Sequence, residues 1–172
     1  MRAKISVGMP CYNSERWISR AIESLLGQTL GDFELIVSDN ASSDRTWDLV
    51  QYYAAIDSRV RPHRNPENLG ASANYNRVFQ LSSAPYFKWA SSNDLCAPAM
   101  LATSLEALAT DTNAVLACPR AAMFSVAPED GHDYPFGLDL RQPDPVARFL
   151  GSLQIRRNIA MNGLIRAAAL RR

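Results

Sequence analysis

The sequence has few of the residues that build disulfide frameworks, metal centres and membrane spans. Among 172 residues there are only two histidines and three cysteines (Cys11, Cys96 and Cys118). The cysteines are odd in number and far apart, so they form neither a disulfide set nor a CxxC metal pair, which indicates a reducing compartment. No apolar stretch approaches the roughly 18 residues that span a bilayer, and no cleavable leader follows Met1. We therefore expect a soluble protein of the cytoplasm.

Neither sign of charge is in excess. Lys and Arg number 18 against 17 Asp and Glu, which argues against a general nucleic-acid partner. Hydrophobic residues make up 47%, enough for a folded core, and the length fits one domain. The charge is uneven, because seven arginines and the single acid Asp144 lie between Arg141 and Arg172. With Phe149 and other apolar residues, this basic segment is typical of contact with an anionic membrane surface or phosphorylated ligands, or of a solvated helix face.

Short apolar runs alternate with amphipathic segments. The runs predict strands over 5–9, 33–38, 59–64, 86–90 and 114–118, with helices between the first four and after Pro98. We expect Pro10 to end the first strand, Asn13 or Ser14 to cap the first helix, and Gly27 or Gly31 to stop it. This order predicts an α/β fold with a doubly wound, mostly parallel, Rossmann-like sheet. Residues 128–145 are rich in proline and glycine and predict an irregular loop or lid.

Polar clusters follow each of the first four predicted strands. They are Tyr12-Asn13, Asp39-Asn40, the Asn-rich stretch 65–68, and Asn93-Asp94. Because ligands of parallel α/β sheets bind beyond the carboxyl ends of the strands, we expect these four loops to face one crevice.

The two carboxylates in these loops each allow two interpretations. Asp39 can accept hydrogen bonds from a nucleobase or a ribose, or it can cap the following helix. Asp94, beside Asn93, suits a divalent cation whose shell is completed by phosphate oxygens and water, or it caps the helix after Pro98.

Other candidates are weaker. The segment around Gly8 supplies no glycine-rich phosphate loop, which argues against a nucleotidyltransferase. Cys11 has no histidine beside it to make it a nucleophile. The three tryptophans, Trp17, Trp47 and Trp89, are expected in the core.

Five segments resemble, in order and spacing, the inverting glycosyltransferases of family two. They are SVGMPCYN at 6–13, IESLLGQT at 22–29, FELIVSDNASSD at 33–44, NLG at 68–70 and ND at 93–94. The resemblance implies a GT-A nucleotide-diphospho-sugar transferase fold and Mg²⁺ or Mn²⁺ as cofactor. It also implies a donor-binding half over residues 1–110 and, within the same structural domain, the start of an acceptor-side half over 111–172.

The resemblance assigns roles to individual positions. Those implied to bind the nucleotide sugar are Pro10, Tyr12, Asn13, Glu15, Asp39, Asn40, Asn68, Gly70, Asn74 and Asn93, and the implied metal ligand is Asp94. Ser92 and Asn93 stand where the family usually has acids, which weakens the expected cation site.

The implied function is transfer of a sugar, with inversion, from a nucleoside-diphosphate sugar to an acceptor hydroxyl. The acceptor is a saccharide, a lipid-linked molecule or a protein, as in polysaccharide biosynthesis. The general base of this family follows the metal motif at a distance that places it beyond Arg172, so no catalytic residue is assigned. The alternative is a nucleotide-sugar binding module, or an inactive truncated fragment, without turnover. The basic segment allows a location at the inner face of the membrane.

Overall fold

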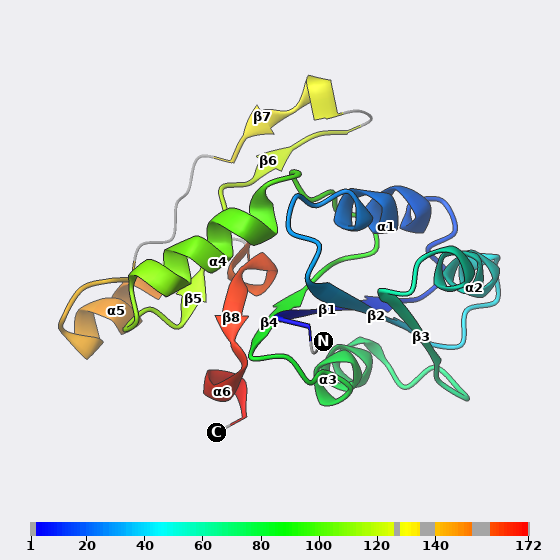
Figure 1. Ribbon diagram of the computed structural model, residues 1–172, viewed down its shortest axis with the longest axis horizontal. Coiled ribbons are helices and arrows are strands. Elements are labelled where there is room, and N and C mark those ends of the chain that lie inside the picture. The colour runs from blue at the N-terminus through cyan, green and yellow to red at the C-terminus, as the bar shows by residue number, and fades with distance from the viewer. Residues whose placement is uncertain (1–2, 126–127, 135–139, 153–158, 172) are drawn as a thin grey trace.

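The computed structural model describes residues 3–125, 128–134, 140–152 and 159–171 of the chain. A six-stranded sheet in the order β3-β2-β1-β4-β8-β5 forms its centre (Figure 1). Its strands are β1 (Ile5–Cys11), β2 (Phe33–Asp39), β3 (Val60–Arg64), β4 (Tyr86–Trp89), β5 (Leu116–Ala117) and β8 (Leu164–Arg166). Strands β1 to β4 are parallel, whereas β8 runs antiparallel to both β4 and β5. The predicted doubly wound, mostly parallel α/β sheet is confirmed.

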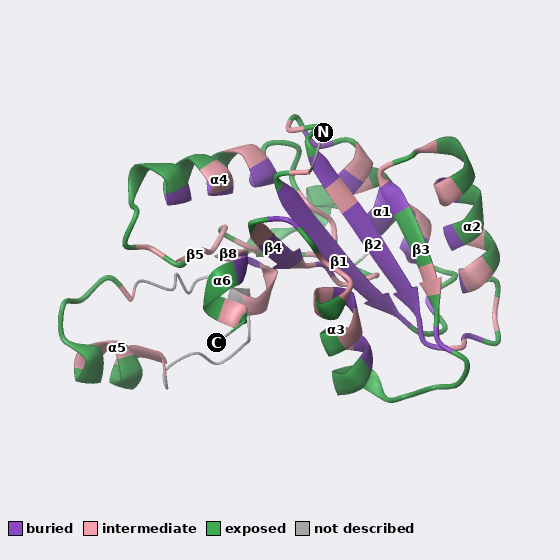
Figure 2. Cartoon of the chain, turned by 60° about the horizontal axis from the view of Figure 1, so that its bottom comes forward, coloured by how far each residue is buried: buried purple, intermediate pink, exposed green. Residues whose placement is uncertain are grey.

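Helices cover both faces of the sheet. The helices are α1 (Ile18–Leu26), α2 (Thr46–Ile56), α3 (Ala71–Gln80), α4 (Met100–Thr110), α5 (Pro145–Ser152) and α6 (Ala167–Leu170). Side chains alternate between the faces of a strand, so Leu35 and Val37 join a core cluster with α1, α2 and α4. Ile36 joins a second cluster with α3 and α6 on the other face. The central strands β1 and β2 are consequently the most buried part of the molecule (Figure 2).

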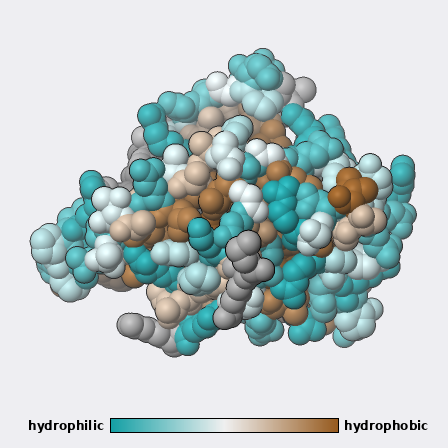
Figure 3. All heavy atoms as spheres, in the orientation of Figure 1, coloured by the Kyte–Doolittle hydropathy of each residue, from teal (hydrophilic) through white to brown (hydrophobic). Residues whose placement is uncertain are grey.

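One face of the molecule is mostly polar (Figure 3). The face in Figure 3 is largely hydrophilic, with apolar atoms exposed mainly across its middle and near α2. Ile56 at the end of α2 is 61% exposed. Strand β3 is the edge of the sheet, which explains why it tolerates Pro62, a residue that cannot donate to a second neighbour.

The prediction that Pro10 ends the first strand was wrong. Strand β1 continues to Cys11, which pairs with Asp39 of β2. On its other side, β1 is paired with β4 only as far as Gly8, whose carbonyl oxygen accepts from the Ala90 N–H. Successive backbone N–H groups of a strand point alternately to its two neighbours. The N–H that Pro10 lacks would point toward β4, with which pairing has already ended at Gly8.

The predicted caps of the first helix were also wrong. Helix α1 begins at Ile18, and its preceding residue, Trp17, makes no side-chain cap. A turn precedes the helix, in which the main-chain oxygen of Ser14 accepts from the Trp17 and Ile18 N–H groups. Gly27 terminates the helix, as predicted.

The segment after α4 is more regular than predicted. A hairpin pairs β6 (Ala122–Met123) with β7 (His132–Asp133), and the short 3-10 helix η1 (Pro128–Asp130) lies between them. Residues 135–139 of the predicted loop lie outside the described residues. A second 3-10 helix, η2 (Ile159–Asn162), leads into β8. Strands β5 and β8, which come from residues 111–172, belong to the same sheet as β1–β4. The division into a donor-binding half over 1–110 and an acceptor-side half over 111–172 stays a prediction.

Candidate functional site

The loops after β1 and β2 are joined by hydrogen bonds. Asn13 adopts a φ of 47°, a left-handed conformation that asparagine tolerates, and its Oδ1 accepts from the Ser43 N–H at 2.9 Å. The Asn13 N–H donates to Ser42 Oγ at 2.9 Å. Glu15 Oε2 accepts from the Arg45 N–H at 3.0 Å. The first two loops thus form one structural unit, in which the Asn13 and Glu15 side chains bind the backbone N–H groups of Ser43 and Arg45.

Asp44 is part of this unit. Its carboxylate accepts from the Glu15 N–H at 3.1 Å and from the Thr46 N–H at 3.0 Å. Burial raises the pKa of this carboxyl, but the hydrogen bonds from Thr46 and Glu15 outweigh that effect and lower the pKa below its ordinary 3.8.

This shift predicts a pH-dependent contribution of Asp44 to stability. Because the folded-state pKa lies below the unfolded one, the stabilisation is fully present above the unfolded pKa and is lost as the pH falls through the folded one. Asp44→Asn should therefore lower the free energy of unfolding near neutral pH and have less effect in acid. Urea unfolding of both proteins at about pH 6 and about pH 3 measures this, and an equal difference at the two pH values would contradict it.

Asp39 is completely buried at the end of β2. Its carboxylate accepts from the Ser42 N–H at 3.2–3.3 Å and from Ser42 Oγ, and it forms an ion pair with Arg64 Nε at 3.1 Å. Helix α2 begins at Thr46 without a side-chain cap from Asp39, so the helix-cap interpretation of Asp39 is wrong. The side chain instead fixes the turn at Ser42 and orients Arg64, whose own side chain is 43% exposed.

A cluster of asparagine side chains joins the loops after β2 and β3. Asn40, Asn65 and Asn74 are 2–3% exposed. Asn65 Nδ2 donates to Asn40 Oδ1 at 2.9 Å and to Asn74 Oδ1 at 3.0 Å, and Asn40 Nδ2 donates to Asn68 Oδ1 at 2.7 Å. Asn68 Oδ1 also accepts from the N–H of Gly70, which has a φ of 82°. The side chains of Asn40 and Asn74 thus hold the 65–70 loop. Asn65, which the sequence placed in a polar cluster but not among the implied ligands, is central to this network.

The loops after β1 and β4 also meet. Ser14 Oγ and Ser92 Oγ lie 2.9 Å apart. Pro10 is buried at the end of β1, and Tyr12, two residues later, is 48% exposed. Hydrogen bonds therefore connect the loops after β1, β2, β3 and β4 at one end of the sheet, as their sequence positions predicted.

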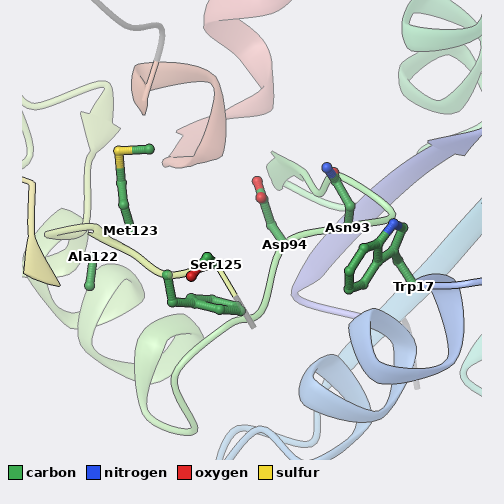
Figure 4. A pocket seen from close by; sticks show the side chains of 7 residues that line it. Trp17, Asn93, Asp94, Ala122, Met123 and Ser125 are labelled. Carbon is green, nitrogen blue, oxygen red and sulfur yellow. The ribbon is translucent and has the colours of Figure 1, made fainter. Parts of the chain in front are cut away.

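Asn93 and Asp94 border a cavity of about 310 Å³. Both side chains are exposed, and Figure 4 shows them between Trp17 and the segment that carries Met123 and Ser125. The cavity is lined by Trp17, Asn93, Asp94, Ala122, Met123, Phe124 and Ser125. Trp17, which we expected in the core, thus lines the cavity, while Trp47 and Trp89 pack against the two core clusters.

Sequence reasoning assigned no role to two buried polar residues, Gln28 and Lys88. Gln28, 6% exposed, donates to the Ala97 oxygen at 2.8 Å and accepts from the Leu101 N–H at 3.0 Å, so it ties the segment after Asp94 to the end of α1. Lys88, 2% exposed, lies within β4, and burial lowers the pKa of its ammonium group against the opposing charge of nearby groups such as Asp94. The sequence did carry a signal for Lys88, because a lysine within an apolar run such as 86–90 is unusual.

The described residues support neither a cysteine nucleophile nor a metal site built from several protein ligands. Burial raises the pKa of the Cys11 thiol far above its ordinary range, and the charges of Asp39 and Asp44 add to this. Cys11 therefore stays protonated, as expected of a cysteine without a base. Within the described ranges, no three His, Cys, Asp or Glu side chains are grouped to hold a metal ion. Asp94 is consequently a single carboxylate.

Solved structures with the same arrangement define the class of fold. The structure of S. aureus TarS 1–349 in complex with UDP matches 98% of this chain and 48% of its own length, with a TM-score of 0.70 at 19% identity. The mannosyltransferase PcManGT from Pyrobaculum calidifontis, in complex with GDP-Man and Mn²⁺, matches 70% of this chain and 36% of its own length, with a TM-score of 0.62 at 21% identity. The fold is that of the GT-A glycosyltransferases.

The sequence comparison identifies the family. Residues 6–172 match the profile of Glycosyl transferase family 2, and the chain belongs to that family. A relative in Escherichia coli, the UDP-Glc:alpha-D-GlcNAc-diphosphoundecaprenol beta-1,3-glucosyltransferase WfgD, is 35% identical over 91 residues. This match covers 53% of the chain and 35% of WfgD. The chain thus spans about a third of the length of the curated relatives it matches.

Proposed function

We propose that this chain binds a nucleoside-diphosphate sugar and contributes the donor site of an inverting glycosyltransferase. The observation that carries the proposal is the hydrogen-bonded set of polar loops at the carboxyl end of β1–β4, next to the cavity at Asp94. Family membership supports it, as do the UDP, UDP-GlcNAc and GDP-Man in the solved structures of TarS and PcManGT.

The nucleotide would lie over the joined loops. Tyr12 is exposed and offers a ring to a base, while Asp39 and Arg64 provide a charged pair at the end of β2. Pro10, Asn13 and Glu15 shape the loop after β1, and Asn40, Asn68, Gly70 and Asn74 shape the loop beneath the nucleotide. In this proposal, the buried asparagines support the pocket, and the exposed side chains contact the donor.

We propose Asp94 as the protein ligand of Mg²⁺ or Mn²⁺, with Asn93 facing the donor. The residues fit such an ion, because Mg²⁺ is commonly held by one or two carboxylates together with substrate phosphates and water. The bound ion would neutralise the charge of the departing diphosphate. The protein's part is to present one exposed carboxylate oxygen beside the cavity.

Transfer with inversion requires a base that deprotonates the acceptor hydroxyl, which attacks the anomeric carbon from the face opposite the diphosphate. We assign this base to none of the described residues. Turnover in the presence of an acceptor therefore distinguishes a transferase from a nucleotide-sugar binding module. A transferase releases free nucleoside diphosphate in the presence of an acceptor, which we propose to be a saccharide, a lipid-linked molecule or a protein, whereas a nucleotide-sugar binding module releases none.

Calorimetric titration with UDP and GDP, each with and without Mn²⁺, tests the donor site. We expect one nucleotide to bind in a Mn²⁺-dependent manner, and Asp94→Ala to weaken that binding at least about 10-fold, or 1.4 kcal/mol. Asp32→Ala, a change at an exposed carboxylate that forms an ion pair with Lys4, is the control and should bind like the unmodified chain. The metal assignment is wrong if Asp94→Ala retains the same Mn²⁺-dependent affinity.

Helix α5 carries the proposal of membrane contact. Among the described residues, no helix is long and apolar enough to cross a bilayer. Val146, Phe149 and Leu150 of α5 are 55–62% exposed at i, i+3 and i+4 spacing, with Arg148 beside them. We place the chain in the cytoplasm, with α5 against the anionic inner face of the membrane. Residues 153–158 and 172 of the basic segment lie outside the described residues.

Vesicle sedimentation checks this contact. The chain should sediment with phosphatidylglycerol vesicles and remain free of phosphatidylcholine vesicles, because the arginines need an anionic surface. Phe149→Ser should reduce the sedimented fraction by removing exposed apolar area. Equal sedimentation with both lipids, or none with either, argues against an electrostatic membrane site.

A further inference from the structure

Lys88 is a charged residue in an apolar place. It lies in β4 between the buried Phe87 and the half-buried Trp89, and only 2% of its surface is exposed. Its ammonium donates to the main-chain oxygen of Asn162 in η2. Burying an ammonium group is costly unless hydrogen bonds or charges compensate it, so a methionine of similar length would serve packing alone better.

The partner of Lys88 leads directly to the candidate metal ligand. The Asn162 side chain donates from Nδ2 to Asp94 Oδ2 at 3.3 Å. Asn162 is followed by β8, whose Ile165 pairs with Phe87 of β4. Lys88 therefore holds the main chain of the residue whose side chain holds Asp94, across 74 positions of sequence.

The contact leaves Asp94 able to bind a cation. Only one carboxylate oxygen of Asp94, Oδ2, accepts from Asn162, and an amide donor at one oxygen orients the carboxylate without competing for the other. Orientation has more effect here than in a site with several acids, because Asp94 is a single carboxylate and Asn93 supplies no charge. A freely rotating carboxylate would lose side-chain entropy on binding the ion.

We propose that Lys88 is a positioning residue: it fixes the main chain at Asn162, so that the Asn162 amide holds the Asp94 carboxylate toward the divalent cation of the donor complex. This inference rests on the proposed function, because it concerns the same cation. A purely structural role would have Lys88 affect only the packing of β4 against η2.

The test compares Lys88→Met, Asn162→Ala and the double variant with the unmodified chain. The apparent affinity for Mn²⁺ is titrated in the presence of whichever of UDP or GDP binds. We expect each single change to weaken Mn²⁺ binding about 5- to 20-fold, and the double variant to be no weaker than the weaker single one, because both act through one contact. Metal-free nucleotide affinity should stay unchanged, whereas a general structural defect would weaken both.

Lys4→Met is the matched control, because the Lys4 side chain is 62% exposed and its change should leave Mn²⁺ affinity unaltered. If Lys88→Met does not fold, Asn162→Ala tests the contact through which Lys88 is proposed to act, and unaltered Mn²⁺ affinity in that variant overturns the positioning role. Folded variants with unaltered Mn²⁺ affinity overturn the positioning role while leaving the donor site intact. Failure of the unmodified chain to bind UDP or GDP at any Mn²⁺ concentration overturns both proposals.

Discussion

Replacing Gly8 with alanine is expected to lower the free energy of unfolding by about 3 kcal/mol, the upper part of the range for overpacked cores. A Cβ atom at Gly8 would lie 2.7 Å from Val78 Cγ2 and 2.8 Å from Phe87 Cζ. Both neighbours are completely buried, Val78 in α3 and Phe87 in β4, so neither can move without disturbing the second core cluster. Since small domains have only about 5–15 kcal/mol of stability, Gly8→Val should prevent folding.

Urea unfolding followed by circular dichroism measures the effect. Gly31→Ala is the matched control, because a Cβ atom there meets nothing within 4 Å. We expect this control to stay within about 0.5 kcal/mol of the unmodified chain, as for most surface substitutions. Similar effects of the two alanine substitutions would show that α3 does not pack against β1 as described.

Replacing Asp39 with alanine should both destabilise the chain and reduce nucleotide binding. The change leaves the buried Ser42 N–H and hydroxyl without their acceptor, at about 3 kcal/mol, while Arg64 is exposed enough to regain water. In the proposed donor site, the turn at Ser42 would also lose its shape. We therefore expect its affinity for UDP or GDP to fall at least about 10-fold, measured at a temperature at which the variant is still folded.

Asp32→Ala provides the comparison for Asp39→Ala. The Asp32 carboxylate is 43% exposed and lies 3.8 Å from Lys4 Nζ, and such surface pairs contribute about 1 kcal/mol or less. Thermal unfolding and calorimetry of both variants separate the two effects. If Asp39→Ala unfolds at the same temperature as Asp32→Ala and binds nucleotide normally, Asp39 has neither role.

Much of the sheet could be predicted from local patterns. Strands β1–β4 and helices α1, α2 and α4 were found because apolar residues recur along each element, and turn residues separate them. The positions of Asp39 and Asp94 followed from the same patterns, since Asp39 comes directly after one apolar run and Asp94 lies in the polar loop after another. The family was evident from the five segments, and the match over residues 6–172 confirms it.

The local rules failed where pairing or loop contacts determined the outcome. Pro10 remains in β1 because pairing with β4 stops at Gly8, a fact that depends on a strand about 80 residues away in sequence. Asn13 and Ser14 do not cap α1 because their polar groups bond to the loops after β2 and β4. A cap is a local motif, whereas the Asn13 and Ser14 side chains are hydrogen-bonded to segments that are distant in sequence.

The sequence by itself determined the order of strands and helices, the polar loops at one end of the sheet and the family. Only the tertiary structure decided which polar groups are buried in hydrogen bonds between loops and which are exposed beside the cavity. Asn40 and Asn74 were predicted to bind the nucleotide sugar, yet their amides are buried against Asn65, while Lys88 reaches Asp94 through Asn162. The physical reason is that periodicity reports which face of an element is apolar, whereas the partner of a buried polar group is set by packing between distant segments.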